Sequence, residues 1–177
     1  LGSGSEALFK EPVLRIPTSN NPIMNVNPVD YHEPPRGDKY DKYEISSAGV
    51  INQDVVDFRP GYKYDLIISI STLEHVGWDE EPKDPEKLLF AIERLKQCLS
   101  PEGKIIVTLT LGYNPEMDQL LKKGRIKFDN QYFFKKISNN NNWKEVNQKE
   151  VVGVGYDNSN MSARGLIIGT VGKFFNL

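Results

Sequence analysis

The chain has 177 residues, of which 38% are hydrophobic and 26% are charged, with a formal net charge of −2, a composition typical of one globular domain. There is no clustered basic excess and no apolar run of about 20 residues, which argues against a nucleic-acid partner and a membrane span. With one cysteine, Cys98, and two histidines, neither a disulfide nor a zinc site can form, so we expect a metal-free, cytoplasmic protein.

The beginning of the chain shows little regular pattern. Residues 1–22 lack hydrophobic periodicity and contain three prolines, so we expect an irregular segment there and a single domain over 23–177. Residues 23–26 are a short apolar stretch that could form a strand. Prolines and Gly37 predict the loop that follows, and residues 50–56 predict the next strand.

The middle of the chain predicts a strand, a helix and a second strand. Residues 64–71 contain a continuous β-branched run, typical of a parallel strand buried on both faces. Asp84 is a good N-cap, and an apolar stripe from Leu88 to Leu99 predicts the helix. Residues 104–111 read as another strand. Because a helical crossover of this length joins parallel neighbours, we expect a mostly parallel sheet.

The last third of the chain predicts smaller elements. A short helix is expected from Asn114 to Leu121, opened by Pro115. Residues 131–146 predict an antiparallel hairpin around four consecutive asparagines, which are common turn residues. A final strand is expected over 166–171. The predicted fold class is therefore α/β, with a mostly parallel sheet and a C-terminal antiparallel hairpin.

In open α/β sheets, ligands bind outside the carboxyl ends of the strands. Four segments follow predicted strands or lie beside them: residues 25–31, 38–44, 54–57 and 69–75. Carboxylates at such positions suit ribose hydroxyls and exocyclic amines, which donate hydrogen bonds. Asp41 and Asp54 are therefore candidates for a nucleoside-type ligand, although strand-end aspartates also serve as caps and turn residues.

Three segments, met in order along the chain, resemble class I S-adenosylmethionine-dependent methyltransferases. These are residues 54–58, 64–76 and 99–104. The resemblance covers roughly residues 41–115 and implies a Rossmann-like fold with S-adenosylmethionine as cofactor. It further implies transfer of a methyl group to a small molecule, such as the hydroxyl or amine of a sugar or metabolite.

The resemblance also implies roles for individual residues on the cofactor side. Asp54, after the third strand, would contact the adenine. Asp41, after the second strand, would bind the ribose hydroxyls, with Glu44 as the fallback. The end of the fourth strand would line the methionine part of the cofactor. The predicted cofactor site comprises Asn25, Asn27, Asp41, Asp54, Val55, Ser69, Ile70 and Ser71.

On the acceptor side, the resemblance places His75 near the mouth of the site. Histidine readily exchanges protons near neutral pH, so His75 is the candidate catalytic base if the acceptor must lose a proton. The predicted acceptor residues are Glu74, Trp78, Tyr113 and Asn114. The alternatives are that Glu74 and His75 anchor the loop, and that Tyr113 and Asn114 serve in ordinary packing and helix capping.

The sequence departs from the family in two places. The family's first strand ends in a glycine-rich turn that lets backbone amides approach the cofactor, whereas residues 23–30 contain no glycine and Pro28 has no amide hydrogen. The connections at 32–37 and 45–49 are too short for full helices, so helices are reduced near the N-terminus. A non-catalytic methyltransferase-fold binding or assembly module is therefore the alternative function, and a thinly covered sheet face predicts a homodimer.

Overall fold

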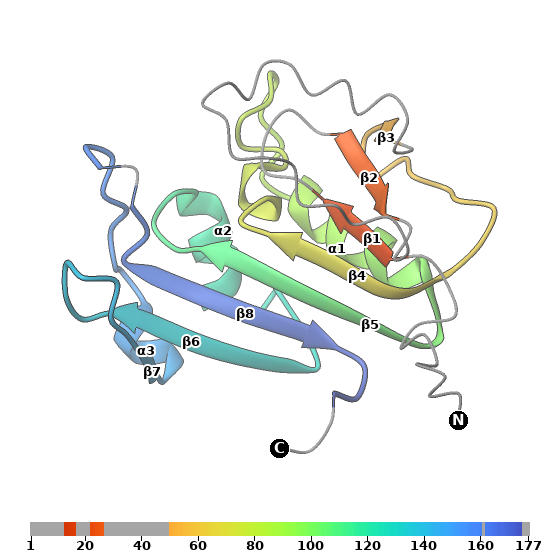
Figure 1. Ribbon diagram of the computed structural model, residues 1–177. Helices are drawn as coiled ribbons and strands as arrows, with labels where there is room; N and C mark the ends of the chain where they lie inside the picture. The colour runs from red at the N-terminus through yellow and green to blue at the C-terminus, as the bar shows by residue number, and fades with distance from the viewer. Residues whose placement is uncertain (1–12, 17–21, 27–49, 161, 175–177) are drawn as a thin grey trace, which may run out of the picture.

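The computed structural model describes residues 13–16, 22–26, 50–160 and 162–174. These residues form an eight-stranded sheet in the order β3-β2-β1-β4-β5-β8-β6-β7 (Figure 1). The strands are β1 (Val13–Ile16), β2 (Pro22–Val26), β3 (Val50–Asn52), β4 (Tyr64–Ile70), β5 (Leu99–Thr110), β6 (Asn130–Lys136), β7 (Trp143–Val146) and β8 (Gly165–Val171). The helices are η3 (Leu73–His75, a 3₁₀ turn), α1 (Lys87–Gln97), α2 (Pro115–Lys122) and α3 (Gln148–Val151).

The sheet is mixed, so the prediction of a mostly parallel sheet is wrong. Only the pairs β1–β4 and β4–β5 are parallel among the described strands, and the other five pairs are antiparallel. A parallel neighbour needs a crossover of about a dozen residues or more. Helix α1 supplies one between β4 and β5, whereas the connection from Ile16 to Pro22 is too short and closes an antiparallel pair.

Two further expectations for the strands can be compared with the structure. The predicted irregular segment over 1–22 contains β1, which lies between β2 and β4 inside the sheet. Four residues between prolines carry no readable periodicity, and β1 owes its extended form to pairing with both neighbours. The predicted C-terminal hairpin is confirmed, since β6 and β7 pair antiparallel.

The β4–α1–β5 unit matches its prediction closely. The helix begins at Lys87, two residues later than expected, because the Asp84 carboxylate caps a preceding turn by accepting from the Glu86 N–H at 3.0 Å. The predicted apolar stripe is buried through Leu88, Ile92 and Leu95. Strand β5 starts earlier than expected, so that the helix leads almost directly into it.

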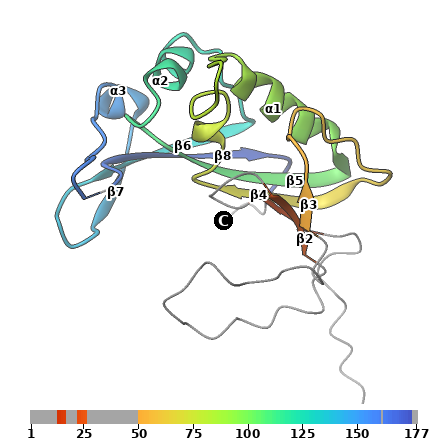
Figure 2. The same cartoon turned by 90° about the horizontal axis from the view of Figure 1, so that it is seen from above.

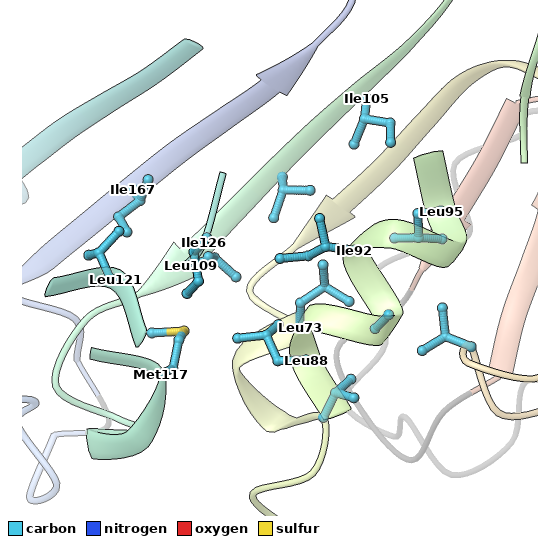
Figure 3. Close-up of a cluster of buried hydrophobic side chains, with 14 of the residues drawn as sticks. Leu73, Leu88, Ile92, Leu95, Ile105, Leu109, Met117, Leu121, Ile126 and Ile167 are labelled. Carbon is cyan, nitrogen blue, oxygen red and sulfur yellow. The ribbon is translucent and has the colours of Figure 1, made fainter. Parts of the chain in front are cut away.

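The hydrophobic core lies between one face of the sheet and the helices. All three α-helices cover that same face, as Figure 2 shows. Figure 3 shows buried side chains of α1 and α2 on the same side as Ile105, Leu109 and Ile167 of the sheet, and Ile67 belongs to the same buried cluster. Each fully buried aliphatic side chain contributes roughly 1.5–3 kcal/mol. No helix within the described ranges is both long and apolar enough to cross a membrane.

The two faces of α1 should respond very differently to truncation. Leu88 is fully buried and Phe90 is largely exposed on the same helix. We expect Leu88→Ala to lower the free energy of unfolding by about 2–4 kcal/mol, through lost burial and a residual cavity. Phe90→Ala should change it by less than about 0.5 kcal/mol. Urea denaturation followed by circular dichroism measures both, and equal losses would contradict this packing.

Candidate functional site

The sheet has a topological switch point between β1 and β4. From β1 the chain continues outward through β2 and β3, and from β4 it continues in the opposite direction to β5. The order β3-β2-β1-β4-β5 coincides with the first five positions of the doubly wound order 3-2-1-4-5-6, although β2 here runs antiparallel. Ligands of such sheets bind outside the carboxyl ends of the strands at the switch, which directs attention to the segment after β4.

The segment after β4 turns sharply and is bound to the end of β5. Ser71 has a φ of 45°, which is uncommon for a residue other than glycine. Its N–H donates to the carbonyl oxygen of Thr108 at 3.1 Å and to the Thr108 Oγ1 at 2.9 Å. Gly77 has a φ of 73°, and the Cβ of any other residue at this position would clash with the Asp84 carbonyl oxygen. The segment between these positions is therefore held in one conformation at both ends.

Glu74 points into the protein and connects three elements. Its Oε1 accepts from the Thr110 N–H at 3.1 Å, and its backbone carbonyl accepts from the Asn114 Nδ2 at 2.9 Å. Burial raises the pKa of the Glu74 carboxyl, and the hydrogen bond from Thr110 only partly offsets this. Asn114 also caps α2 by accepting from the Met117 N–H. Both Glu74 and Asn114 are buried, so their position matches the anchoring and capping alternative, and any role toward an acceptor stays a prediction.

Asp54 lies at the same edge of the sheet but is already engaged. Strand β3 runs in the direction of β1 and β4, so the turn after it lies at their carboxyl ends. The Asp54 Oδ1 accepts from the Val56 N–H at 3.0 Å, and its Oδ2 lies 2.5 Å from the Lys87 Nζ. Partial burial alone would raise the pKa of Asp54, but these two partners together lower it. Val55 is buried in the core.

The first predicted loop is displaced from this site. Strand β2 is antiparallel to β1, and its register places Asn25 opposite Leu14, near the start of β1 and away from its carboxyl end. Strand direction therefore places Asn25 away from the segment after β4, so the structure does not bring it together with the other predicted cofactor residues. Asn27 and Asp41 lie outside the described residues.

The last two residues of β4 differ sharply in their exposure. Ser69 is buried, and its Oγ has no hydrogen-bond partner among the described residues. Such an unsatisfied buried hydroxyl is costly and calls for a physical explanation. Ile70, the next residue, is 40% exposed at the strand end. Because successive residues of a strand point to opposite faces, Ser69 lies on the core-facing side with Ile67, whereas Ile70 points to the other face and is open to an apolar contact.

A polar and aromatic cluster lies beside this position. The Nδ1 of His75 is 2.6 Å from the Oδ2 of Asp79, and the Tyr113 hydroxyl donates to that same oxygen at 2.8 Å. The rings of His75 and Tyr113 are 4.5 Å apart between centroids, and Tyr156 meets Tyr113 edge-on at 5.4 Å. Burial and the hydrogen bond to Asp79 raise the pKa of Tyr113 to about 12, so its hydroxyl stays a donor at neutral pH.

Tyr113, a predicted acceptor residue, is thus brought together with His75, the predicted base, whereas Trp78 contacts Lys83. The Nζ of Lys83 lies 3.6 Å from the centre of the Trp78 ring, a cation–π contact. Sequence reasoning missed Asp79 and Tyr156. The available signal for Asp79 was that it lies close to His75 in the sequence, across a turn in which Gly77 has a positive φ.

Comparisons with known proteins leave the family open. No protein-family model matches the chain, and no curated protein matches its sequence. Among solved structures, the chain is similar to an S-adenosylmethionine-dependent methyltransferase from Clostridium acetobutylicum ATCC 824, with 10% identity and a TM-score of 0.30. The match covers 70% of this chain and 64% of that one, so the chain spans less than two thirds of that protein. A TM-score this low does not establish a shared fold.

Asp118 in α2 should make stability depend on pH. Its Oδ2 accepts from the Gly112 N–H at 3.0 Å, and burial raises the pKa of Asp118 to about 6. The folded state therefore keeps a proton that the unfolded chain loses near pH 4. This contribution to stability is fully present below about pH 4 and is lost as the pH rises through about 6.

Asp118→Asn keeps an oxygen for the Gly112 N–H but cannot ionise. We expect the wild type to lose about 1–2 kcal/mol of unfolding free energy relative to this variant between pH 4 and 7, after allowing for solvent screening. Urea denaturation at a series of pH values measures the difference, with the exposed Glu116→Gln as control. Parallel pH profiles for the wild type and Asp118→Asn would contradict the assignment.

Proposed function

We propose that this chain binds S-adenosylmethionine at the carboxyl ends of β1 and β4 and transfers its methyl group to a small molecule. The observation that carries the proposal is the switch point between these two parallel strands, with the order β3-β2-β1-β4-β5 around it. The resemblance of residues 54–58, 64–76 and 99–104 to class I methyltransferases supports it, because the first segment follows β3 and the second contains β4 and the turn after it, both at this edge.

Different described residues at this edge would contact the cofactor and the acceptor. S-adenosylmethionine, when bound, supplies the methyl group. Ile70 offers an apolar contact, and Ser71 holds the turn in a strained backbone conformation of the kind that gathers at functional sites. Beyond them, His75 and Tyr113 would face the acceptor, for which we propose a hydroxyl or amine of a sugar or metabolite.

A second candidate function is a non-catalytic binding or assembly module built on the same fold. The specific observation in its favour is the state of Asp54, the residue that the resemblance assigns to the adenine. Both of its carboxylate oxygens are taken by the Val56 N–H and by Lys87. A module of this kind would not require the cofactor, so cofactor affinity separates the two functions.

Calorimetric titration with S-adenosylmethionine and S-adenosylhomocysteine tests the proposal. We expect a micromolar dissociation constant for the wild type, and a loss of at least about tenfold, or 1.4 kcal/mol, for Ile70→Arg, because the substitution removes the apolar contact and places a cation beside the sulfonium. Ile137→Arg is the matched control, since Ile137 is 61% exposed and follows β6, two strands beyond β5.

Two outcomes would count against a methyltransferase. The absence of heat for the wild type at millimolar ligand would favour the non-catalytic module. Equal weakening by Ile70→Arg and Ile137→Arg would mean that any binding site lies elsewhere. Asp41→Ala, measured in the same way, tests the ribose contact that the resemblance implies outside the described residues.

A further inference from the structure

We propose that Asp79 is a positioning residue that holds His75 with its proton on Nδ1, so that Nε2 accepts a proton from a hydroxyl-bearing methyl acceptor. The hydroxyl acceptor rests on the proposed function, whereas the positioning of His75 by Asp79 rests only on the geometry of the two side chains. Neither the resemblance nor any comparison assigns a role to Asp79.

The backbone brings the two side chains together. The carbonyl oxygen of His75 accepts from the N–H groups of both Trp78 and Asp79 at 3.0 Å, which closes a tight turn in which Val76 is extended and Gly77 has a φ of 73°. The resulting distance of 2.6 Å between the His75 Nδ1 and the Asp79 Oδ2 is that of a short, charge-assisted hydrogen bond.

The hydrogen bonds decide which ring nitrogen carries the proton. A carboxylate only accepts, and the Asp79 Oδ2 already receives the Tyr113 hydroxyl at 2.8 Å, so the proton toward His75 must come from Nδ1. In a neutral imidazole the other nitrogen is then an acceptor. Nε2 has no hydrogen-bond partner among the described residues, which leaves it available to a ligand.

Tyr113 and Tyr156 keep this arrangement rigid while leaving it accessible. Tyr113 binds Asp79 through its hydroxyl and contacts the imidazole with its ring, and Tyr156 supports Tyr113 from the side. The His75 side chain remains 35% exposed and that of Asp79 45%. An oriented histidine with one open nitrogen, supported by a carboxylate, is the arrangement by which acyl-transfer enzymes activate a hydroxyl.

This chemistry narrows the acceptor class. A carboxylate acceptor has no proton to lose, whereas a hydroxyl must lose one as it is methylated. In the proposed step the acceptor O–H bond breaks and its proton passes to Nε2, while the oxygen forms a bond to the methyl group as the methyl–sulfur bond breaks. The products are the methyl ether, the neutral thioether and an imidazolium, which returns its proton to water.

Nitrogen NMR of the imidazole rings tests the positioning role without an acceptor. The chain has two histidines, His32 and His75, so long-range ¹H–¹⁵N correlations resolve each ring. At a pH where the rings are neutral, we expect the Nδ1–H tautomer to predominate at His75. Free imidazole side chains favour the opposite, Nε2–H tautomer, so Asp79→Ala should return His75 to Nε2–H.

Two variants keep the test specific. Asp79→Asn should retain the Nδ1–H tautomer, because its amide oxygen can still accept. Asp57→Ala, an exposed aspartate at the same edge of the sheet, should leave His75 unchanged and controls for general effects. An Nε2–H tautomer in the wild type, or no change in Asp79→Ala, would overturn the proposal.

Calorimetry separates this inference from the proposed function. Because Asp79 lies outside the proposed cofactor contacts, we expect Asp79→Ala to bind S-adenosylhomocysteine within about twofold of the wild type, a difference of about 0.4 kcal/mol. A wild type that shows the Nδ1–H tautomer but binds no cofactor would refute the methyltransferase and retain the positioning of His75. Cofactor binding with an Nε2–H tautomer would refute the positioning of His75 alone.

Discussion

The buried hydrogen bond between the Glu74 carboxylate and the Thr110 N–H is the constraint on which the candidate site depends. Together with the bond from Asn114 to the Glu74 carbonyl, it connects the segment after β4 to the end of β5 and to the start of α2. A buried carboxyl that loses such a partner costs on the order of 1–3 kcal/mol. Glu74 therefore acts as an internal clamp, and the adjacent His75 is turned outward toward Tyr113.

This clamp divides the carboxyl edge of the sheet into two parts. On the side of β1 and β4, Ile70 offers the apolar contact proposed for the cofactor. On the side of β5, Asp79 joins the imidazole of His75 to the hydroxyl of Tyr113. A methyl donor and its acceptor must be aligned for transfer, and such alignment can lower the activation barrier by several kcal/mol. Under the proposed function, the hydrogen bonds of Glu74 would hold the cofactor side and the acceptor side of this edge in a fixed relation to each other.

The sequence predicted the elements whose signals are local. The β-branched run before Ser69 and the stripe from Leu88 to Leu95 identified β4, α1 and the buried face of the helix. It did not predict β1, because a four-residue strand is defined by its neighbours, nor the direction of β2, which depends on pairing. The contact between Asp54 and Lys87 joins residues far apart in the chain, so no spacing rule could reveal it. The inward orientation of Glu74 could not be predicted, because it depends on the Thr110 N–H, a backbone group that no sequence pattern marks.

The central claim is that a nucleoside-containing ligand binds at the switch point between β1 and β4. Amide chemical-shift mapping of the ¹⁵N-labelled chain on addition of S-adenosylhomocysteine tests it most directly. The account predicts saturable shifts that are largest over residues 69–75 and in the turn after β3, with the β6–β7 hairpin unchanged. The absence of shifts at saturating ligand, or shifts centred on that hairpin, would contradict it.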